Sequence, residues 1–188
     1  MDIFVTADMH FGHANIIKYC KRPFDNIEKM NETLIRNWNN RVKKDDLVYH
    51  LGDFCFYTGK EGYGKKAQHW INQLNGKIVF IKGNHDRNNG IRGMLSYGVI
   101  HQSKKIILLT HIPPMNKPVN PVYDTEHMLN NVDIVLCGHV HEAWIANRNK
   151  NYPEVPLINV GVDVQKFMPR KLEEMIILAQ RENKKGTY

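Results

Sequence analysis

Cysteine is scarce in this chain, and the few cysteines present do not form a disulfide or metal-binding pattern. Cys20, Cys55 and Cys137 are widely spaced, and no two of them are separated by two residues. An odd, scattered set argues against both a disulfide framework and a cysteine-ligated zinc site. Cys137 lies in an apolar run beside Gly138, where a small buried hydrophobe is the expected role.

Long apolar runs are also missing. No stretch of about 18 apolar residues occurs, so we expect no transmembrane helix and no membrane partner. The first residues do not combine a basic segment with a long apolar one, so no secretory signal is predicted and the expected location is cytoplasmic. Residues 1–188 are expected to form a single domain, because the length suits one sizeable core and no repeat or linker is visible.

Positive charge exceeds negative charge, with 26 Lys and Arg against 19 Asp and Glu and a net charge of +7. Such an excess favours anionic partners, a nucleotide or a nucleic acid among them. The cations are scattered, however, and the chain has neither an Arg-rich arm nor the aromatic and glycine motif of an RNA-binding module. We interpret the charge mainly as a solvated surface, with nucleic-acid binding as the alternative.

The first apolar run of the chain leads directly to two side chains that bind metal ions. Ile3 to Val5 is of strand type and is followed by Asp8 and His10. In an extended segment, residues two positions apart project to the same side, so Asp8 and His10 are expected to point together. A carboxylate and a neutral imidazole suit Mn, Fe, Zn, Ni or Co. Taken alone, the triplet is more typical of a capping Asp and a surface His.

The same arrangement recurs at four later apolar runs. The residues that follow them are Gly52-Asp53, Gly83-Asn84-His85-Asp86, His111 and Gly138-His139-x-His141. Ligands in open α/β sheets gather beyond the carboxyl ends of the strands, so five strand ends would bring these donors to one edge. A glycine before Asp53, Asn84 and His139 fits a sharp turn close to an ion. Together the five motifs predict a metal centre.

The number of donors predicts two ions. A single catalytic zinc needs about three protein ligands, and the motifs offer more than that. Two divalent transition-metal ions fit if one carboxylate bridges them, and Asp53, central in the series, is the expected bridge. Two ions roughly 3.5–4 Å apart can hold a hydroxide between them and clamp both oxygens of an in-line displacement. We therefore expect a phosphodiester or phosphomonoester to be hydrolysed by attack of a bridging hydroxide at phosphorus, with Mn as the ion expected in vitro.

Apolar periodicity alternates between helix and strand types along the chain, which predicts an α/β fold. The expected helices are Asn15 to Cys20, Ile27 to Val42 capped by Asp25 or Asn26, Ala67 to Leu74 ended by Asn75-Gly76, Ile91 to Tyr97, Thr125 to Asn131 and Leu172 to Arg181. The expected strands are Ile3 to Val5, Asp46 to Leu51, Lys77 to Ile81, Val99 to Gln102, Lys104 to Thr110, Asp133 to Cys137, Glu142 to Arg148 and Val155 to Val160. Glycine-rich and proline-rich loops are expected at residues 57–64 and 113–121.

Taken in order, the five motifs resemble those of the calcineurin-like metallophosphoesterase superfamily. They run from Asp8 to His141, and the strands between them agree as well, so the resemblance covers most of the chain. A compact branch found in bacteria and their phages is resembled more closely still. That narrower likeness depends on the residues His13, Asn15, Arg22-Pro23-Phe24 and Asn159-Val160-Gly161-Val162-Asp163. The family implies two mixed β-sheets packed as a sandwich flanked by helices, a four-layer αββα arrangement with a dinuclear site at the sheet rim.

The resemblance also implies a role for each motif residue. His85 would face the substrate phosphate and would stabilise or protonate the leaving oxygen, and Asp86 would orient the His85 ring. The expected ligands are Asp8, His10 and His141 for the first ion, Asn84, His111 and His139 for the second, and Asp53 for both.

Several other polar residues have two possible roles. His13 would either reach the substrate phosphate or cap the helix after it, and Arg22 would either contact the phosphate or form a surface ion pair. His50, on a predicted core strand, is expected to be packed and hydrogen-bonded. Structural or exposed positions are expected for His69, His101 and His127. Packing is favoured over stacking on a nucleic-acid base for Tyr57, Tyr63, Tyr123 and Trp144.

Three functions from different classes fit these patterns. The first is a metal-dependent phosphodiesterase or phosphatase acting on a phosphate-ester substrate. The second is a nuclease that uses the same centre on DNA or RNA, favoured by the charge and disfavoured by the lack of an evident DNA-tracking element. The third is a non-catalytic scaffold of this fold. A scaffold would be expected to lose ligands or the phosphate-facing histidine, and this sequence keeps them all.

Overall fold

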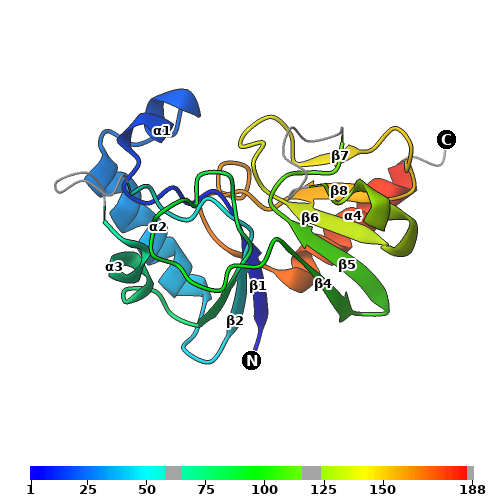
Figure 1. Cartoon of the computed structure of the whole chain (residues 1–188), viewed down its shortest axis with the longest axis horizontal. Coiled ribbons are helices and arrows are strands. Elements are labelled where there is room, and N and C mark those ends of the chain that lie inside the picture. The colour runs from blue at the N-terminus through cyan, green and yellow to red at the C-terminus, as the bar shows by residue number, and fades with distance from the viewer. Residues whose placement is uncertain (58–64, 116–123, 186–188) are drawn as a thin grey trace.

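A computed structural model describes residues 1–57, 65–115 and 124–185, and within these the strands form two sheets (Figure 1). The first sheet has the order β3-β2-β1-β9 and the second the order β4-β5-β6-β8-β7. The strands of the first sheet are β1 (Ile3–Thr6), β2 (Leu47–His50), β3 (Lys77–Phe80) and β9 (Arg170–Lys171). Those of the second are β4 (Tyr97–Gln102), β5 (Lys105–Thr110), β6 (Ile134–Cys137), β7 (Ala146–Arg148) and β8 (Pro156–Asn159).

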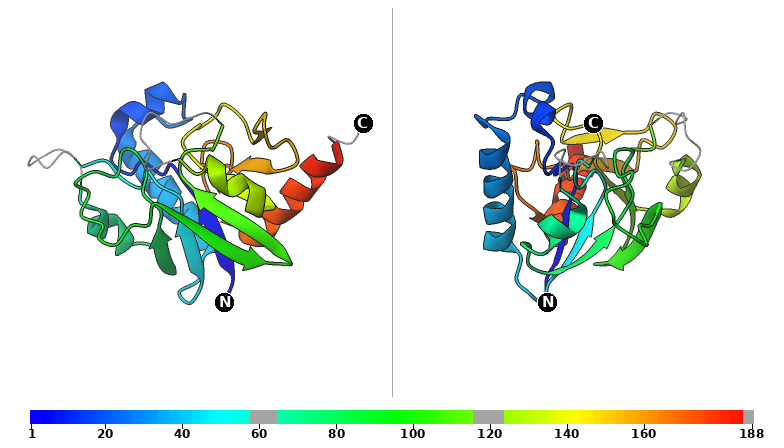
Figure 2. Two further views of the ribbon diagram at one scale, coloured as in Figure 1. Left: turned by 45° about the vertical axis from the view of Figure 1, so that its right-hand side comes forward. Right: turned by 60° about the vertical axis from the view of Figure 1, so that its left-hand side comes forward.

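Helices cover the outer faces of the sheets and one end of the sandwich. The helices are α1 (Ala14–Tyr19), α2 (Ile27–Arg41), α3 (Ala67–Ile71), the 3-10 helix η2 (Glu126–Asn131) and α4 (Leu172–Lys185). The right-hand view of Figure 2 shows α2 outside the first sheet, with the strands of the second sheet on the far side. This α/β arrangement of two mixed sheets with flanking helices is the one predicted. No helix in the described part of the chain is long and apolar enough to cross a membrane.

Alternation of side chains along the strands produces this layering. In β1, Phe4 packs outward with Met30, Leu34 and Trp38 of α2, whereas Val5 packs inward with the second sheet. Each fully buried apolar side chain of this kind contributes about 1.5–3 kcal/mol. Between the sheets the shared core consists of residues such as Val5, Leu51, Ile81, Ile107, Leu109, Leu136 and Ile158.

Parallel pairing brings the motif loops to one edge. β1 pairs in parallel with β2, and β2 with β3, so that Thr6, His50 and Phe80 end their strands in register. In the second sheet β5, β6 and β8 are also parallel. The loops after β1, β2, β3, β5 and β6 are the five that carry the motifs, and their common edge is where the metal centre was predicted.

Several local predictions differ from the structure, including the strand expected from Glu142, which begins only at Ala146. The helix expected over residues 91–97 is absent, because Gly90 (φ 90°) and Gly93 (φ 70°) turn the chain and Leu95 then bonds to the backbone of β3. The helix starting at Ala67 ends at Ile71, short of the expected Leu74. The two-residue strand β9 was not predicted, since two residues give no periodic signal.

His50 is buried in the first sheet without a hydrogen-bond partner. Its ring contacts Phe54 and Phe80 edge-on or tilted, at centroid distances of 5.0 and 5.8 Å, and neither ring nitrogen has a partner. The predicted packing is therefore confirmed, but the predicted hydrogen bond is wrong. Burial lowers the pKa of His50 to about 3, with the nearby His111 acting in the same direction.

His50 should make the fold acid-sensitive. Because the pKa of His50 is about 3 in the folded chain and near 6.5 in the unfolded one, only the unfolded chain takes up the proton between these values. The contribution of His50 to the free energy of unfolding is therefore complete above pH 6.5. It decreases by about 1.4 kcal/mol per pH unit as the pH falls toward 3. His50→Phe should reduce the slope of unfolding free energy against pH by that amount, measured by urea unfolding in the presence of EDTA. His101→Phe, an exposed histidine on β4, should not change the slope, and equal slopes for the wild type and His50→Phe would contradict the account.

Candidate metal centre

The backbone at the predicted ligands is unusual. Five of the seven predicted ligands have positive φ, although none is glycine: Asp8 (58°), His10 (50°), Asp53 (56°), His139 (72°) and His141 (47°). Non-glycine residues rarely adopt this left-handed region, and where they do they cluster at functional sites. Asp8 and His10 are therefore not in an extended segment as predicted. Their donor atoms nevertheless lie within 4.8 Å of each other and of a donor atom of His141.

Backbone hydrogen bonds hold the motif loops against one another. The N–H of Asp8 donates to Gly52 O and that of His10 to Asp53 O, each at 3.0 Å. Across the two sheets, the N–H of His139 donates to both oxygens of the Asp8 carboxylate, at 3.1 and 3.0 Å. These bonds fix three loops relative to one another before any ion is bound.

The Asp53 carboxylate lies between the two predicted ligand sets. Its Oδ2 is 3.4 Å from Nε2 of His10 and 3.5 Å from Nε2 of His111, while Oδ1 accepts the N–H of His85 at 2.9 Å. Oδ2 thus faces one imidazole from each set, which is the position that a bridging carboxylate requires. Asp8, Asp53 and His111 also form a group of donors within 4.8 Å of one another.

The second predicted set converges on Asn84. Its Oδ1 lies 2.9 Å from Nε2 of His111 and 2.9 Å from Nδ1 of His139. Nδ1 of His111 lies 2.8 Å from the carbonyl oxygen of Leu51, so Nε2 is the ring nitrogen that faces the centre. Histidines that bind metal ions commonly donate their other N–H to a carbonyl or carboxylate in this way. The amide and two imidazoles therefore form one compact donor set.

Burial controls the protonation of the centre. It raises the pKa of Asp8 to about 6, lowers that of His10 well below its usual range and lowers that of His139 to about 4. Burial acts against ionisation of Asp53 and His111 too, but their proximity holds the pKa of Asp53 below its usual range and raises that of His111 to about 9. The centre is thus a buried cluster of carboxylates and imidazoles, several of them favoured as unprotonated donors.

Two observations test whether this donor set fits metal ions. Nε2 of His10 is buried and has no hydrogen-bond partner, although it points to the Asp53 carboxylate. Such an unpaired group costs about 1–3 kcal/mol unless something binds it. Gly83 also leaves no room for a side chain, because an added Cβ would collide with Asp53. Mixed carboxylate, amide and imidazole donors suit divalent transition metals, so the residues fit the predicted ions.

Asp86 does not have the predicted contact with the His85 ring. Its Oδ2 accepts the N–H of Asp53 at 2.7 Å and that of Gly83 at 2.9 Å, and its Oδ1 accepts the N–H of Phe54 at 3.0 Å. Asn89 donates to Oδ1 as well. The carboxylate is buried and occupied by these donors, so Asp86 holds the Asp53 and Gly83 turns together. The orienting role that the resemblance implied for Asp86 is therefore not supported by its contacts.

Arg22 is neither a phosphate contact nor a surface ion pair. Its side chain is buried and makes a bidentate pair with Asp163, with Nε at 2.7 Å from Oδ1 and NH2 at 3.0 Å from Oδ2. It also donates to the carbonyl oxygens of Asp8 and Met9, at 2.7 and 3.1 Å. The prediction of substrate binding by Arg22 is therefore wrong, because its donors are consumed inside the protein.

Asp163 is a residue whose role sequence reasoning missed. Its Oδ2 lies 2.9 Å from Nδ1 of His141, so the carboxylate that pairs with Arg22 also orients a predicted ligand. Burial alone would lower the pKa of His141, but the contact with the Asp163 carboxylate raises it to about 10. Asp163 appeared in the motif near the end of the chain, and a carboxylate behind a ligand histidine is a common arrangement in metal sites.

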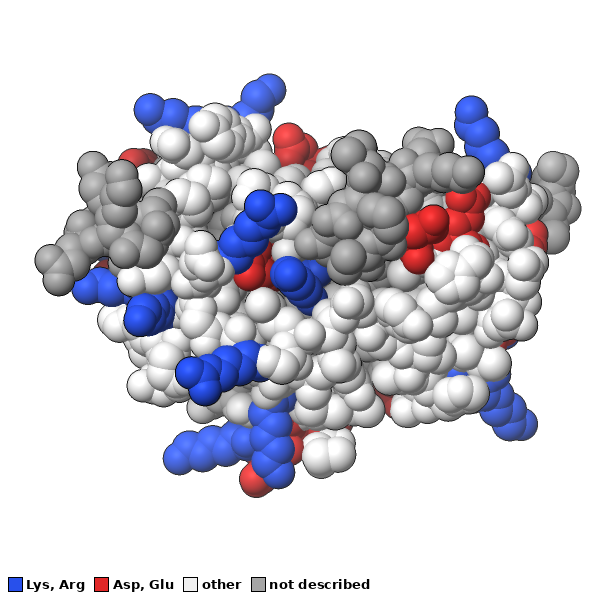
Figure 3. Space-filling view, in the orientation of Figure 1, with Lys and Arg blue, Asp and Glu red and all other residues white. Residues whose placement is uncertain are grey.

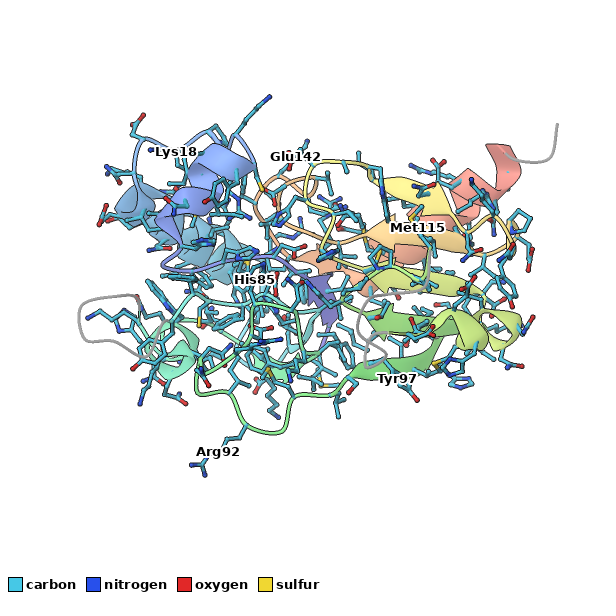
Figure 4. All side chains as sticks on the ribbon, turned by 45° about the horizontal axis from the view of Figure 1, so that its top comes forward. Lys18, His85, Arg92, Tyr97, Met115 and Glu142 are labelled. Carbon is cyan, nitrogen blue, oxygen red and sulfur yellow. The ribbon has the colours of Figure 1, made fainter. Side chains whose placement is uncertain are left out.

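The remaining predicted residues have simpler positions. His13 occupies the N-cap position of α1, as one of its two predicted roles required, although only its carbonyl oxygen accepts a helix N–H, from Ile16, and its side chain makes no capping hydrogen bond. The His13 ring stacks on Phe56 at 4.5 Å and lies 5.4 Å from the ring of His10, and the substrate role stays a prediction. His85 is exposed at the rim and labelled near the middle of Figure 4. As expected, His69, His101 and His127 are exposed. Trp144 packs against the core, whereas Tyr63 and Tyr123 lie outside the described residues.

Known proteins resemble this chain over nearly its whole length. The family model described as the calcineurin-like phosphoesterase superfamily domain matches residues 1–182. An uncharacterized protein of Methanocaldococcus jannaschii is 39% identical over 183 residues, which are 95% of this chain and 92% of that protein. The gene 66 protein of Mycobacterium phage L5 is 25% identical over 181 residues, 84% of each chain. A crystal structure of a protein of unknown function from Aquifex aeolicus has a TM-score of 0.71 at 25% identity and covers 94% of this chain and 98% of its own.

Asp53→Asn should reduce metal occupancy at both positions together. The wild type is expected to bind two divalent ions per chain at saturating Mn, because Asp53 Oδ2 faces an imidazole from each set. An amide is a weaker donor than a carboxylate for both. Elemental analysis after gel filtration measures the ratio, and Asp45→Asn, at an exposed position before β2, is the matched control. Retention of two ions by Asp53→Asn, or a single ion in the wild type, would contradict the bridge.

Arg22→Met should destabilise the fold. Removing one member of a buried ion pair leaves the other without compensation, at a cost of about 3–5 kcal/mol. Urea unfolding should show this loss, and adding Asp163→Leu to Arg22→Met should recover part of it. Arg36→Met, at an exposed position on α2, is the control and should stay within about 0.5 kcal/mol of the wild type. A stable Arg22→Met protein with weakened substrate binding would restore the phosphate role.

Proposed function

Because this chain belongs to the calcineurin-like phosphoesterase superfamily, whose members depend on metal ions, we propose that it hydrolyses a phosphodiester or a phosphomonoester. The observation that supports this most strongly is the place of Asp53 Oδ2 between His10 of one ligand set and His111 of the other. An exposed His85 stands directly beside this pair, since its backbone is bonded to Asp53. A buried donor cluster with one exposed imidazole at its rim is suited to a substrate that binds from solvent.

Seven residues would hold two divalent transition-metal ions, with Mn as the ion for first assays. When bound, such ions lower the pKa of a water molecule and neutralise the charge that develops on phosphoryl oxygens. Side chains of the protein would hold the ions, bind the phosphoryl oxygens and protonate the leaving group. The ligands are Asp8, His10 and His141 on one side, Asn84, His111 and His139 on the other, and Asp53 between them.

We propose that His85 acts on the leaving group. Its ring is exposed, lies 5.6 Å from the ring of His10 by centroid, and makes no hydrogen bond within the described residues. Its main chain is fixed by the bond from its N–H to Asp53 and by the bond from Arg87 N–H to its carbonyl. The ring is therefore held at the rim and keeps its nitrogens for a substrate.

The proposed reaction is a substitution at phosphorus. A bond forms between phosphorus and a water oxygen, and the bond from phosphorus to the leaving oxygen breaks. His85 donates a proton to that oxygen, so the product leaves as an alcohol, and the water proton released on the other side restores the histidine through solvent. Asn84 can contribute as well, because its oxygen faces His111 and His139 while its amide N–H groups stay available for a phosphoryl oxygen.

His85→Ala should cut turnover by roughly two to four orders of magnitude, the usual contribution of a positioned general acid. The loss should be larger for esters with an alkyl or nucleoside leaving group than for nitrophenyl esters, because nitrophenolate departs with little protonation. Steady-state kinetics on a matched pair of phosphodiesters measures this difference. Both metal ions should stay bound, since Asn84 rather than His85 is the ligand.

The control is His127→Ala, an exposed histidine in η2 that should leave the kinetics unchanged. Equal losses on both esters, or loss of an ion from His85→Ala, would show that His85 has a structural role. Absence of turnover by the wild type on aryl monoesters, aryl diesters, cyclic nucleotides and single-stranded DNA with Mn would overturn the proposed function itself.

A further inference from the structure

A basic groove adjoins the metal centre on the side of the loop that follows β3. Its volume is about 760 Å³, and four cations line it: Lys66, Lys82, Arg87 and Arg92. Figure 3 shows several Lys and Arg side chains gathered over the half of this face that holds α3 and that loop. None of the four forms an ion pair with another described residue.

The groove has more positive than negative charge among its described lining residues. Asp86 is the one carboxylate among them, so it offsets at most one of the four cations, and hydrogen bonds from Asp53, Phe54, Gly83 and Asn89 hold it in place. An unbalanced group of cations in a hollow attracts anions more strongly than the same cations spread over a flat surface. We therefore expect the groove to favour a ligand with several negative charges.

Most of the groove lining lies on the same segment as Asn84 and His85 of the proposed active site. Lys82 precedes the Asn84-His85 pair, and Arg87 follows it, with Arg87 N–H bonded to His85 O at 2.8 Å. Figure 4 shows His85 near the middle of the molecule and Arg92 at its outer edge, so the loop leads from the metal centre outward. An anion bound along this loop would extend away from a phosphate held at His85.

Aromatic and apolar surface alternates with the positive charge. Nζ of Lys66 lies 5.8 Å from the centre of the Tyr57 ring, which lines the groove. A second hollow of about 460 Å³ shares Gly90, Ile91 and Arg92 with the groove and is otherwise lined mainly by apolar side chains. Its apolar members include Ile71, Ile78 and Phe80. Positive charge beside an aromatic face is the combination that binds unpaired nucleotides, since any base can stack.

We propose that this basic groove binds single-stranded nucleic acid and presents one of its phosphodiesters to the metal centre, an inference that rests on the proposed function. The cations contact successive phosphates, while Tyr57 and the apolar hollow accept bases. A duplex is disfavoured, because its bases are already stacked and paired. An acidic protein is disfavoured too, since carboxylates would use the cations but leave the adjoining aromatic and apolar surface without a matching group.

Binding tests the groove separately from hydrolysis. The probe is fluorescein-labelled dodecathymidylate with phosphorothioate linkages, titrated with the Mn-loaded protein and followed by fluorescence anisotropy. Lys66→Gln combined with Arg92→Gln should weaken binding by about tenfold or more and reduce the slope of log K against log salt by about 1.4, since each single-strand phosphate contact contributes about 0.7. Lys44→Gln combined with Lys150→Gln is the matched control, because these exposed lysines precede β2 and β8, at the ends of the strands opposite the metal centre.

Equal affinity and equal salt slope in the groove variant and the wild type would overturn the inference. Competition by polyglutamate as effective as that by unlabelled oligothymidylate would overturn it also, because the groove would then respond to charge alone. Tighter binding of the duplex than of the single strand would point to a different ligand.

Hydrolysis then separates this inference from the proposed function. The groove variant should lose at least about tenfold more kcat/KM on an ordinary oligothymidylate than on bis(4-nitrophenyl) phosphate. A wild type that cleaves the aryl diester but neither binds nor cleaves the oligonucleotide would refute the groove and leave the phosphoesterase standing. A wild type that binds the oligonucleotide through the groove but hydrolyses no ester would refute the proposed function.

Discussion

The Asp86 carboxylate is the constraint on which the metal centre depends. Its two buried oxygens accept backbone N–H groups from the loop after β2 and the loop after β3, so two strand ends are joined by one side chain. Buried backbone donors without such a partner would each cost about 1–3 kcal/mol. Asp53 and Asn84, one from each loop, are held at a fixed separation as a result. Asp86, although adjacent to His85 in the sequence, thus positions the predicted bridging residue Asp53 rather than the His85 ring.

Arg22 plays the corresponding part on the other side of the centre. Its guanidinium holds the carbonyls of Asp8 and Met9 and, through Asp163, the ring of His141. Asp8 in turn accepts the backbone N–H of His139 from the second sheet. The two sheets are therefore joined at the rim by charged groups, while apolar side chains join them deeper in the sandwich. An ion would bind between parts that are already tied together, which lowers the entropic cost of binding.

The α/β order and the convergence of the motif residues at one edge could be predicted from short-range patterns, whereas the two-sheet sandwich was expected only from the family resemblance. Strand runs ending in metal-type residues are visible in the sequence, and parallel pairing then brings them to one edge. What could not be predicted depends on partners far away in the chain, as in the pair of Arg22 with Asp163, 141 positions apart. The conformation after β1 was missed for another reason, since periodicity assumes an extended chain and Asp8 and His10 are left-handed. The irregular segment before Tyr97 was missed because apolar spacing outweighed the two glycines within it.

Backbone strain and an unpaired imidazole nitrogen also point to a functional site at the predicted ligands. Five predicted ligands adopt backbone conformations that cost on the order of 1–3 kcal/mol each, and Nε2 of His10 is buried without a hydrogen-bond partner. If stability alone were required, glycine at the positions with positive φ and an apolar residue in place of His10 would remove both costs. These costs are offset by Asp86, Arg22 and the hydrogen bonds between loops, which hold the donors in place. The loop after β3 carries the predicted ligand Asn84, the exposed His85 and most of the lining of the basic groove in succession, so the segment that would hold an ion would also fix where a bound phosphate meets it.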